Sequence, residues 1–269
     1  MGVQGNGRTL AILGFHKIGP APGGWETWFY VPQATFVGYL EYLKEDGWQV
    51  LDVAAFLRGL VEPDSLPERA ALITFDDGYR SILDFGVPEL RRFGYPAVMF
   101  VPTAFIGGHN DFDADNEPKE AICGWEELRE LERCGVSVQS HGVSHRAFSE
   151  LNAWEQRQEL LRSKAVLEDG LGKPVEVFSY PYGDCGPEPG ATRNGVEQAG
   201  YRAACLYGGG PHRVPVADPY RLARLAMGPD TDLSRCLVAG PRRAAQRRKS
   251  SAVKSRIDRV GKDSVREVK

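Results

Sequence analysis

Long apolar segments are missing from this chain of 269 residues. No run of apolar residues approaches the roughly 20 that a membrane-spanning helix needs, so we expect no such helix. Residues 1–8 also lack a charged segment followed by an apolar one, which is the pattern of a secretory signal. Together these two absences favour a cytoplasmic location.

Cysteine is scarce, and its spacing indicates no disulfide framework. The chain has 5 cysteines, an odd number, and they show no paired spacing. Secreted domains that depend on disulfides carry even sets of cysteines at regular spacings. We therefore expect reduced thiols that pack within the fold, and the chemistry considered below needs no cysteine.

Apolar strand-like runs alternate with helical patterns along most of the chain. With 42% hydrophobic residues, 269 residues are enough to bury a full core. Such alternation predicts an α/β fold with a parallel sheet, as a single barrel or as a domain with an extension. We expect strands at 10–15, 48–51, 70–75, 97–101, 136–140, 175–180, 203–206 and 222–226, helices at 36–46, 53–60, 88–93 and 152–171, and a polar loop at 106–121.

Residues 240–269 differ in composition from residues 1–239, which we expect to form the folded domain. The segment has 11 Lys and Arg against 3 Asp and Glu, and few large apolar residues. This composition is typical of a disordered, solvated tail. A second interpretation is docking onto an anionic membrane surface or nucleic acid. The segment has no aromatic residue for base stacking, which weakens a role in nucleic-acid binding.

Two adjacent carboxylates, Asp76 and Asp77, follow the expected strand at 70–75 and precede Gly78. Because Asp and Gly are ordinary turn residues, one interpretation is a solvated turn. The other is a functional pair, since two carboxylates at this separation repel each other unless a cation or a proton gives them different roles. One of them would then bind a metal, and the other would act as a base.

Two imidazoles, His141 and His145, follow the expected strand at 136–140. Their spacing of four residues places both rings on one side of a helical turn, as in pairs of zinc ligands. Each residue could instead be an ordinary hydrogen-bonding histidine. Together with Asp77 they would form three protein ligands with open positions for water and substrate, which is typical of a catalytic metal site.

With a third segment, these motifs make the chain resemble the polysaccharide deacetylase family, also called NodB homology or carbohydrate esterase family 4. The resemblance runs from about residue 10 to residue 228. Residues 74–78 (Thr-Phe-Asp-Asp-Gly) match the first family motif, and residues 141–145 are similar to the second, with Gly142 in place of the usual Ser or Thr. Residues 178–183 (Phe-Ser-Tyr-Pro-Tyr-Gly) resemble the third. The resemblance implies a distorted (β/α)7 barrel.

Two departures from the family pattern concern groups with catalytic roles. The third motif often carries an Arg two residues before its Pro, where it orients the catalytic Asp; here that position is Ser179, and Arg221 or Arg224 is a candidate replacement. The family's late Leu-x-His is absent. A permuted branch, similar to poly-N-acetylglucosamine deacetylases, has that His after the first strand, where this chain has His16. His16 is therefore the candidate general acid, and a structural histidine at a strand end is the alternative.

The resemblance implies a metal-dependent hydrolase that removes the N-acetyl group from an N-acetylated amino sugar and releases acetate. Its cofactor would be a divalent metal ion, zinc or else cobalt, nickel or manganese. The residues to which it assigns roles are the metal ligands Asp77, His141 and His145, the base Asp76, the acid His16, the oxyanion-binding backbone N–H of Tyr182, and the substrate contacts Tyr79, Tyr180 and Pro181.

The absence of a secretion signal favours a cytosolic glycoside, a nucleotide sugar or a lipid-linked saccharide as substrate over a mature cell-wall polymer. One alternative is a hydrolase of an ester or of another C–N bond, a reaction that the same groups could catalyse. Another is a non-catalytic carbohydrate-binding relative, suggested by the missing Arg and the displaced His. No specific nucleic-acid partner is expected, and the basic segment leaves peripheral contact with an anionic membrane open.

Overall fold

The computed structural model describes residues 7–25 and 27–238. The central strands are short apolar runs, buried along nearly their whole length, as expected for parallel strands that are covered on both faces. The strands are β1 (Thr9–Phe15), β2 (Lys17–Ile18), β3 (Tyr30–Val31), β4 (Gln49–Val50), β5 (Arg69–Phe75), β6 (Ala97–Val101), β7 (Val136–Ser140), β8 (Val177–Ser179), β9 (Ala203–Cys205), β10 (His212–Arg213) and β11 (Leu225–Ala226).

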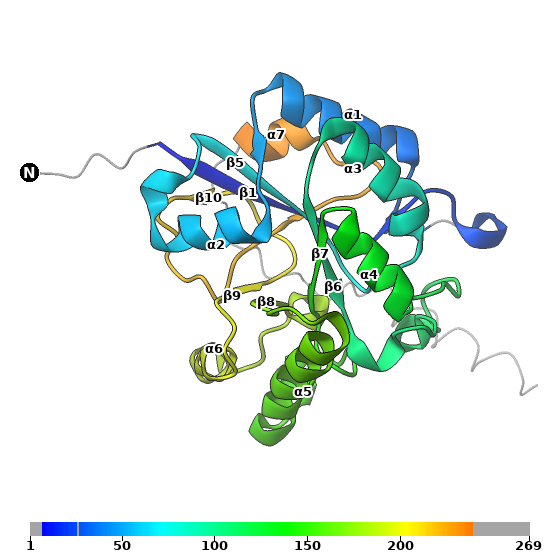
Figure 1. Cartoon of the computed structure of the whole chain (residues 1–269), viewed down its shortest axis with the longest axis vertical. Helices are drawn as coiled ribbons and strands as arrows, with labels where there is room; N and C mark the ends of the chain where they lie inside the picture. The colour runs from blue at the N-terminus through cyan, green and yellow to red at the C-terminus, as the bar shows by residue number, and fades with distance from the viewer. Residues whose placement is uncertain (1–6, 26, 239–269) are drawn as a thin grey trace, which may run out of the picture.

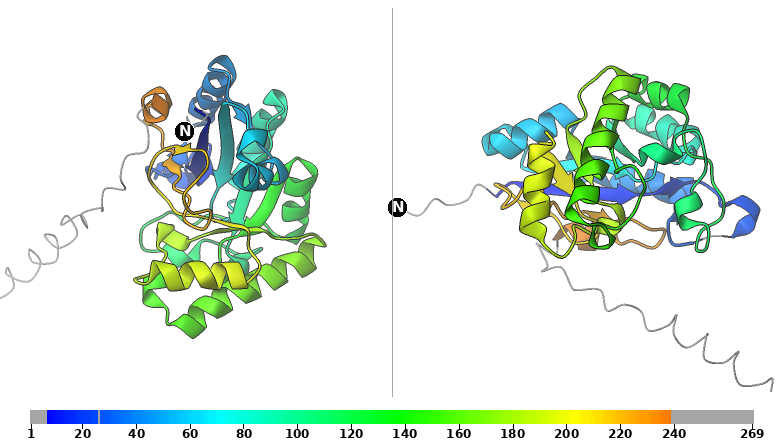
Figure 2. Two further views of the ribbon diagram at one scale, coloured as in Figure 1. Left: turned by 90° about the vertical axis from the view of Figure 1, so that its left-hand side faces the viewer. Right: turned by 90° about the horizontal axis from the view of Figure 1, so that it is seen from below.

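The main sheet curls into a barrel. Its parallel strands follow the order β1-β5-β6-β7-β8-β9 (Figure 1). Residues 222–226 close the ring, because Leu222 forms a parallel bridge to Cys205 of β9 and β11 pairs in parallel with β1. Figure 2 accordingly shows the late, orange part of the described chain lying beside the blue first strand. This architecture is the distorted (β/α)7 barrel expected from the sequence.

Helices surround the barrel (Figures 1 and 2). The longest begins after Asn152, whose side chain accepts hydrogen bonds from the N–H groups of Trp154 and Glu155, and it ends before Gly172 in the left-handed conformation. Both ends therefore carry the capping residues that isolated helix termini need. The helices are α1 (Gln33–Glu45), α2 (Val53–Val61), α3 (Val87–Phe93), α4 (Trp125–Arg133), α5 (Ala153–Leu171), α6 (Pro189–Gln198) and α7 (Leu233–Val238).

Alternate residues of the strands belong to two separate apolar clusters. Leu10 and Ile12 of β1 join the cluster that also contains residues of α2, such as Phe56. Leu13 and Phe15 of the same strand join the larger cluster, which also contains residues of α1, α3, α4 and α5. This alternation fixes which way each strand faces, and so it fixes the direction of the polar residues that follow the strand ends.

Most of the expected elements are present, with shifts of a few residues at their ends. The sequence did not predict β10, which pairs antiparallel with β1, nor the helices α6 and α7. The expected tail at 240–269 lies outside the described residues. Within the described part of the chain, no helix is both long and apolar enough to cross a membrane.

Candidate active site

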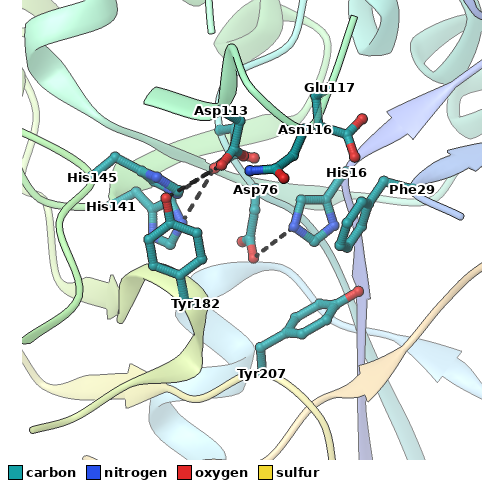
Figure 3. Close-up of a pocket in the computed structure, with 11 residues that line it drawn as sticks. His16, Phe29, Asp76, Asp113, Asn116, Glu117, His141, His145, Tyr182 and Tyr207 are labelled. Carbon is teal, nitrogen blue, oxygen red and sulfur yellow. Dashed lines mark hydrogen bonds and ion pairs between the residues drawn. The ribbon is translucent and has the colours of Figure 1, made fainter. Parts of the chain in front are cut away.

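A pocket of about 210 Å³ lies where the carboxyl ends of the barrel strands meet. Parallel barrels gather their functional side chains at this end, because every strand points toward it. The pocket contains residues of all three sequence motifs and residues from other loops (Figure 3). Its lining residues are His16, Phe29, Asp76, Asp77, Asp113, Asn116, Glu117, His141, His145, Tyr182 and Tyr207.

Asp77, His141 and His145 converge on one point and are all buried. Oδ1 of Asp77 lies 3.0 Å from Nε2 of His145 and 3.4 Å from Nε2 of His141. Ligand atoms of a tetrahedral zinc ion, each about 2.0–2.1 Å from the metal, are themselves about 3.3 Å apart. The donor types and their spacing therefore fit a divalent metal ion bound by these three side chains.

The hydrogen bond of His141 fixes the direction of its ring. Its Nδ1 lies 2.7 Å from the carbonyl oxygen of Ser179, to which the Nδ1–H donates, so the Nε2 lone pair faces Asp77. Burial alone would raise the pKa of the Asp77 carboxyl, but the neighbouring imidazoles of His145 and His141 outweigh it and hold that pKa well below its usual range. Asp77 is thus an anion at neutral pH, which is the form that binds metal.

The backbone is strained at three positions of the site. Asp77, His145 and Tyr182 have φ angles of 71°, 56° and 58°, and no other non-glycine residue in the described part of the chain has a positive φ. Residues persist in this region only where their surroundings hold them there, and such strain concentrates at functional sites. All three positions had been assigned functional roles from the motifs.

Asp76 is held by the guanidinium of Arg224. The guanidinium makes two parallel bonds to it, with Nη1 to Oδ1 at 2.7 Å and Nη2 to Oδ2 at 2.6 Å. Burial would raise the pKa of Asp76, but the charge of Arg224 and of the nearby His141 brings it below its ordinary value. A buried bidentate pair of this kind fixes the position of the carboxylate as well as its charge.

Of the two candidate arginines, Arg224 is the one that contacts Asp76. It lies in the segment 222–226 that closes the barrel and is fully buried, whereas Arg221 is exposed. Nη2 of Arg224 also donates to Oγ of Ser179, the residue that stands where the family motif often has Arg. The small Ser179 side chain therefore leaves room for a guanidinium that arrives from the neighbouring strand position.

His16 lies on the opposite side of Asp76 from His141 and His145 (Figure 3). Its Nε2 is 4.0 Å from Oδ2 of Asp76, and its ring contacts Phe29 and Tyr207 at centroid distances of 4.6 and 5.0 Å. Burial lowers the pKa of His16, and the negative charges of Asp77 and Asp76 offset only part of that effect. The permuted position therefore brings an imidazole to the pocket.

The polar loop at 106–121 supplies one wall of the pocket through Asp113, Asn116 and Glu117. Glu117 accepts hydrogen bonds from Nζ of Lys17 at 2.7 Å and from the hydroxyl of Thr27 at 2.8 Å. Lys17, only 1% exposed, joins this loop to the strand end that carries His16. Sequence motifs gave no signal for the pocket residues Phe29, Asn116, Glu117 and Tyr207.

The remaining sequence-predicted residues are not brought together in the same way. Tyr182 lines the pocket, is 55% exposed, and directs its hydroxyl toward Oδ1 of Asp113 at 3.3 Å. Tyr79, Tyr180 and Pro181 are buried and do not line it. The hydroxyl of Tyr180 donates to the carbonyl oxygen of Tyr220, so its polar end is already occupied. Direct contact of these three residues with substrate stays a prediction, and their positions favour support of the pocket wall.

Comparison with known proteins decides the family. The family model of the polysaccharide deacetylases matches residues 64–204, more than half of the chain. The chain belongs to the polysaccharide deacetylase family. The family resemblance inferred from the motifs is thereby confirmed.

Two curated relatives show how far the similarity extends. This polysaccharide deacetylase family member is 26% identical over 193 residues to YxkH of Bacillus subtilis (strain 168), whose name assigns it provisionally to the same family. The match covers 72% of the chain and 62% of YxkH. The chain is also 28% identical over 179 residues to the poly-β-1,6-N-acetyl-D-glucosamine N-deacetylase of Escherichia coli (strain K12), covering 53% of the chain and 26% of that enzyme. It thus spans less than two thirds of either relative.

Among solved structures, IcaB from Ammonifex degensii superposes with a TM-score of 0.70 at 22% identity. The superposition covers 83% of this polysaccharide deacetylase family member and 94% of IcaB. At this identity the likeness concerns the fold, and it agrees with the barrel described above.

Proposed function

We propose that this chain is a metal-dependent N-deacetylase that releases acetate from an N-acetylated amino sugar, in a glycoside, a nucleotide sugar or a lipid-linked saccharide. The observation that carries the proposal is the division between two adjacent carboxylates. Oδ1 of Asp77 faces two imidazole nitrogens, whereas both oxygens of Asp76 are bound by Arg224. Asp77 is thus arranged to bind a metal ion, and Asp76 is arranged to accept a proton.

The three ligand candidates suit zinc, with cobalt, nickel and manganese as alternatives. A divalent ion held by Asp77, His141 and His145 would lower the pKa of water and polarise an acyl carbonyl group. The hydrogen bond from His141 to the carbonyl oxygen of Ser179 keeps one ring in the orientation that such an ion requires.

Asp76 is the proposed base. Its lowered pKa keeps it ionised at neutral pH, and Arg224 keeps it in place, so it can accept the proton of an attacking water. His16 is the proposed acid for the departing amine, which is a poor leaving group without a proton. Because burial lowers the pKa of His16, its ring gives up a proton readily once it is charged. The backbone N–H of Tyr182 is the proposed oxyanion donor.

Two observations support this function over carbohydrate binding without catalysis. The binding alternative was suggested by the missing motif Arg and the displaced His, and the structure has Arg224 on Asp76 and His16 at the pocket. The E. coli relative is named as an N-deacetylase of a poly-N-acetylglucosamine, which supports an N-acetylated hexosamine as the substrate class.

The test is acetate release from a panel of N-acetyl-hexosamine mono- and oligosaccharides by the zinc-loaded protein. Asp76→Asn should lower the rate by roughly a hundredfold or more, while the metal content stays that of the wild type. O-acetylated and other acylated sugars in the same panel separate N-deacetylation from ester hydrolysis. Saccharide binding without acetate release by metal-loaded protein would favour the binding alternative instead.

A further inference from the structure

The two histidines of the proposed metal site are oriented by different means. Nδ1 of His141 donates to the carbonyl oxygen of Ser179. Nδ1 of His145 is buried and has no hydrogen-bond partner among the described residues. Metal-binding imidazoles are normally held by a bond from the second ring nitrogen. The ring of His145 must therefore be positioned through its packing and through its own backbone.

The turn that leads into His145 is bound by the carboxylate of Glu159, which lies in α5 and is 9% exposed. Oε2 of Glu159 accepts hydrogen bonds from the backbone N–H of Val143 at 2.5 Å and of Ser144 at 3.0 Å. Oε1 of Glu159 accepts a hydrogen bond from the hydroxyl group of Ser144, with 2.7 Å between the two oxygens. One side chain thus satisfies the backbone donors of two successive residues immediately before His145.

The opposite side of the same turn is bound by the segment after β6. The backbone N–H of Thr103 donates to the carbonyl oxygen of Gly142, and that of Ala104 donates to the carbonyl oxygen of Val143, both at 3.0 Å. The N–H groups of Val143 and Ser144 are partly buried, and the acceptor that the structure gives them is the carboxylate of Glu159. Without that carboxylate, the two N–H groups would be left without a charged acceptor.

Gly142 makes room for this contact. It stands where the second family motif usually has Ser or Thr. A Cβ at this position would lie 2.8 Å from Oε2 of Glu159, and the φ of Gly142 is +81°, which disfavours any other residue. The Glu159 carboxylate can therefore approach this turn because residue 142 is Gly and not the Ser or Thr of the family motif.

We infer that Glu159 is a positioning residue that holds the strained backbone of His145, and thereby its Nε2, in the metal-binding geometry. The inference rests on the proposed metal site, because it assigns Glu159 a role toward that site. His145 has a φ of 56°, and a residue in this region keeps it only if its neighbours impose it. Glu159 touches neither the proposed ion nor the pocket, so its effect passes through residues 143 and 144.

The experiment measures zinc affinity by competition with a chromophoric chelator, together with the melting temperature of the zinc-free protein. Glu159→Ala should weaken zinc binding by about 10–100-fold, which is the usual effect of losing an orienting partner. Glu159→Gln keeps one acceptor oxygen and should weaken it by less. The matched control is Glu168→Gln on the same helix, since Glu168 also accepts a backbone N–H, that of Val175, away from the pocket.

A second variant tests the contact from its other side. Gly142→Ala should weaken zinc binding in the wild-type background, because the new methyl group displaces the Glu159 carboxylate. The same change should cost less in the Glu159→Ala background, since neighbouring residues that share one contact are not additive. The melting temperature of each zinc-free variant is measured in parallel, so a loss of zinc affinity can be told apart from a loss of folding.

The outcomes separate this inference from the proposed function. Weaker zinc binding in folded Glu159 variants, with Glu168→Gln unchanged, supports the inference. Wild-type zinc affinity in both Glu159→Ala and Glu159→Gln, with only the melting temperature lowered, overturns it while leaving the metal site intact. Failure of the wild-type protein to bind zinc, cobalt, nickel or manganese overturns the proposed function and this inference together.

Discussion

At the residue scale, the contact between Arg224 and Asp76 has a consequence for pH dependence. The guanidinium lowers the pKa of Asp76 against the opposing effect of burial, so its loss must raise that pKa. In Arg224→Lys, the single ammonium group cannot reproduce the two parallel bonds. We expect the acidic limb of the pH–activity profile to move to higher pH, and activity at neutral pH to fall roughly tenfold or more.

The control for this change is Arg221→Lys, three residues earlier on the same segment and exposed. It should leave the profile in place. If Arg224→Lys kept the wild-type acidic limb, Arg224 would not be the group that lowers the pKa of Asp76.

A second residue-scale expectation concerns His16 and the leaving group. If His16 protonates a departing amine, His16→Gln should lower acetate release from N-acetyl-hexosamines by about a hundredfold. Hydrolysis of an activated aryl acetate should change little, since its leaving group needs no proton. Steady-state kinetics on both substrates give the comparison, with His212→Gln as a control outside the pocket. Equal losses on both substrates would return His16 to a structural role.

At the scale of elements, the buried pair of Lys17 and Glu117 joins β2 to the loop at 106–121. Lys17 also lies over the rings of Tyr30 and Tyr79, at 4.4 and 4.6 Å from their centroids. Lys17→Met leaves the Glu117 carboxylate buried without its cation, and we expect the free energy of unfolding to fall by about 3–5 kcal/mol. Urea unfolding of the metal-free protein measures this change.

The double variant Lys17→Met/Glu117→Leu should recover much of that loss, because both charges are then removed. The exposed pair of Arg133 and Glu130 provides a contrast, and Arg133→Met should change stability little. A small effect of Lys17→Met alone would show that the loop does not depend on this pair.

The elements also explain which parts of the site the sequence could predict. Asp76 and Asp77 follow β5 directly, and His141 and His145 lie within five residues of the end of β7, so local patterns place them at one end of a parallel barrel. Arg224 reaches Asp76 only because residues 222–226 close the ring between β9 and β1, a contact over 148 positions that no local pattern contains. The sequence therefore left Arg221 and Arg224 as equal candidates.

Loop residues escaped prediction for a related reason. Phe29, Glu117 and Tyr207 reach the pocket because their loops are tied to distant segments, as Glu117 is to Lys17 and Thr27. Tyr180 illustrates the converse: its motif lies at the site, and its ring packs against Phe148 and Phe178 in the core. A motif locates a backbone segment, and the surrounding fold decides which of its side chains face the pocket.

At the scale of the whole molecule, metal binding and stability should be linked. A ligand that binds only the folded state at 100 times its dissociation constant adds about 2.7 kcal/mol of stability. For a chain of this size we expect zinc to raise the melting temperature by roughly 5–10 °C. Asp77→Asn should abolish the shift, and chelation should reverse it in the wild type. An equal shift in Asp77→Asn would place the metal elsewhere.

Location and surface contacts also belong to this scale, and they stay predictions. The cytoplasmic location inferred from the sequence, and the contact of residues 240–269 with an anionic membrane, depend on parts of the chain outside the described residues. The fold and the family hold independently of both.

The most direct test of the account is a diffraction experiment on zinc-loaded crystals at wavelengths on either side of the zinc absorption edge. We expect one strong anomalous peak at about 2.0–2.2 Å from Oδ1 of Asp77, Nε2 of His141 and Nε2 of His145, with Asp76 still bound to Arg224 and outside the metal's ligand set. A peak that includes Asp76 as a ligand, or no peak between these three residues, would contradict the division of roles on which the proposed deacetylase rests.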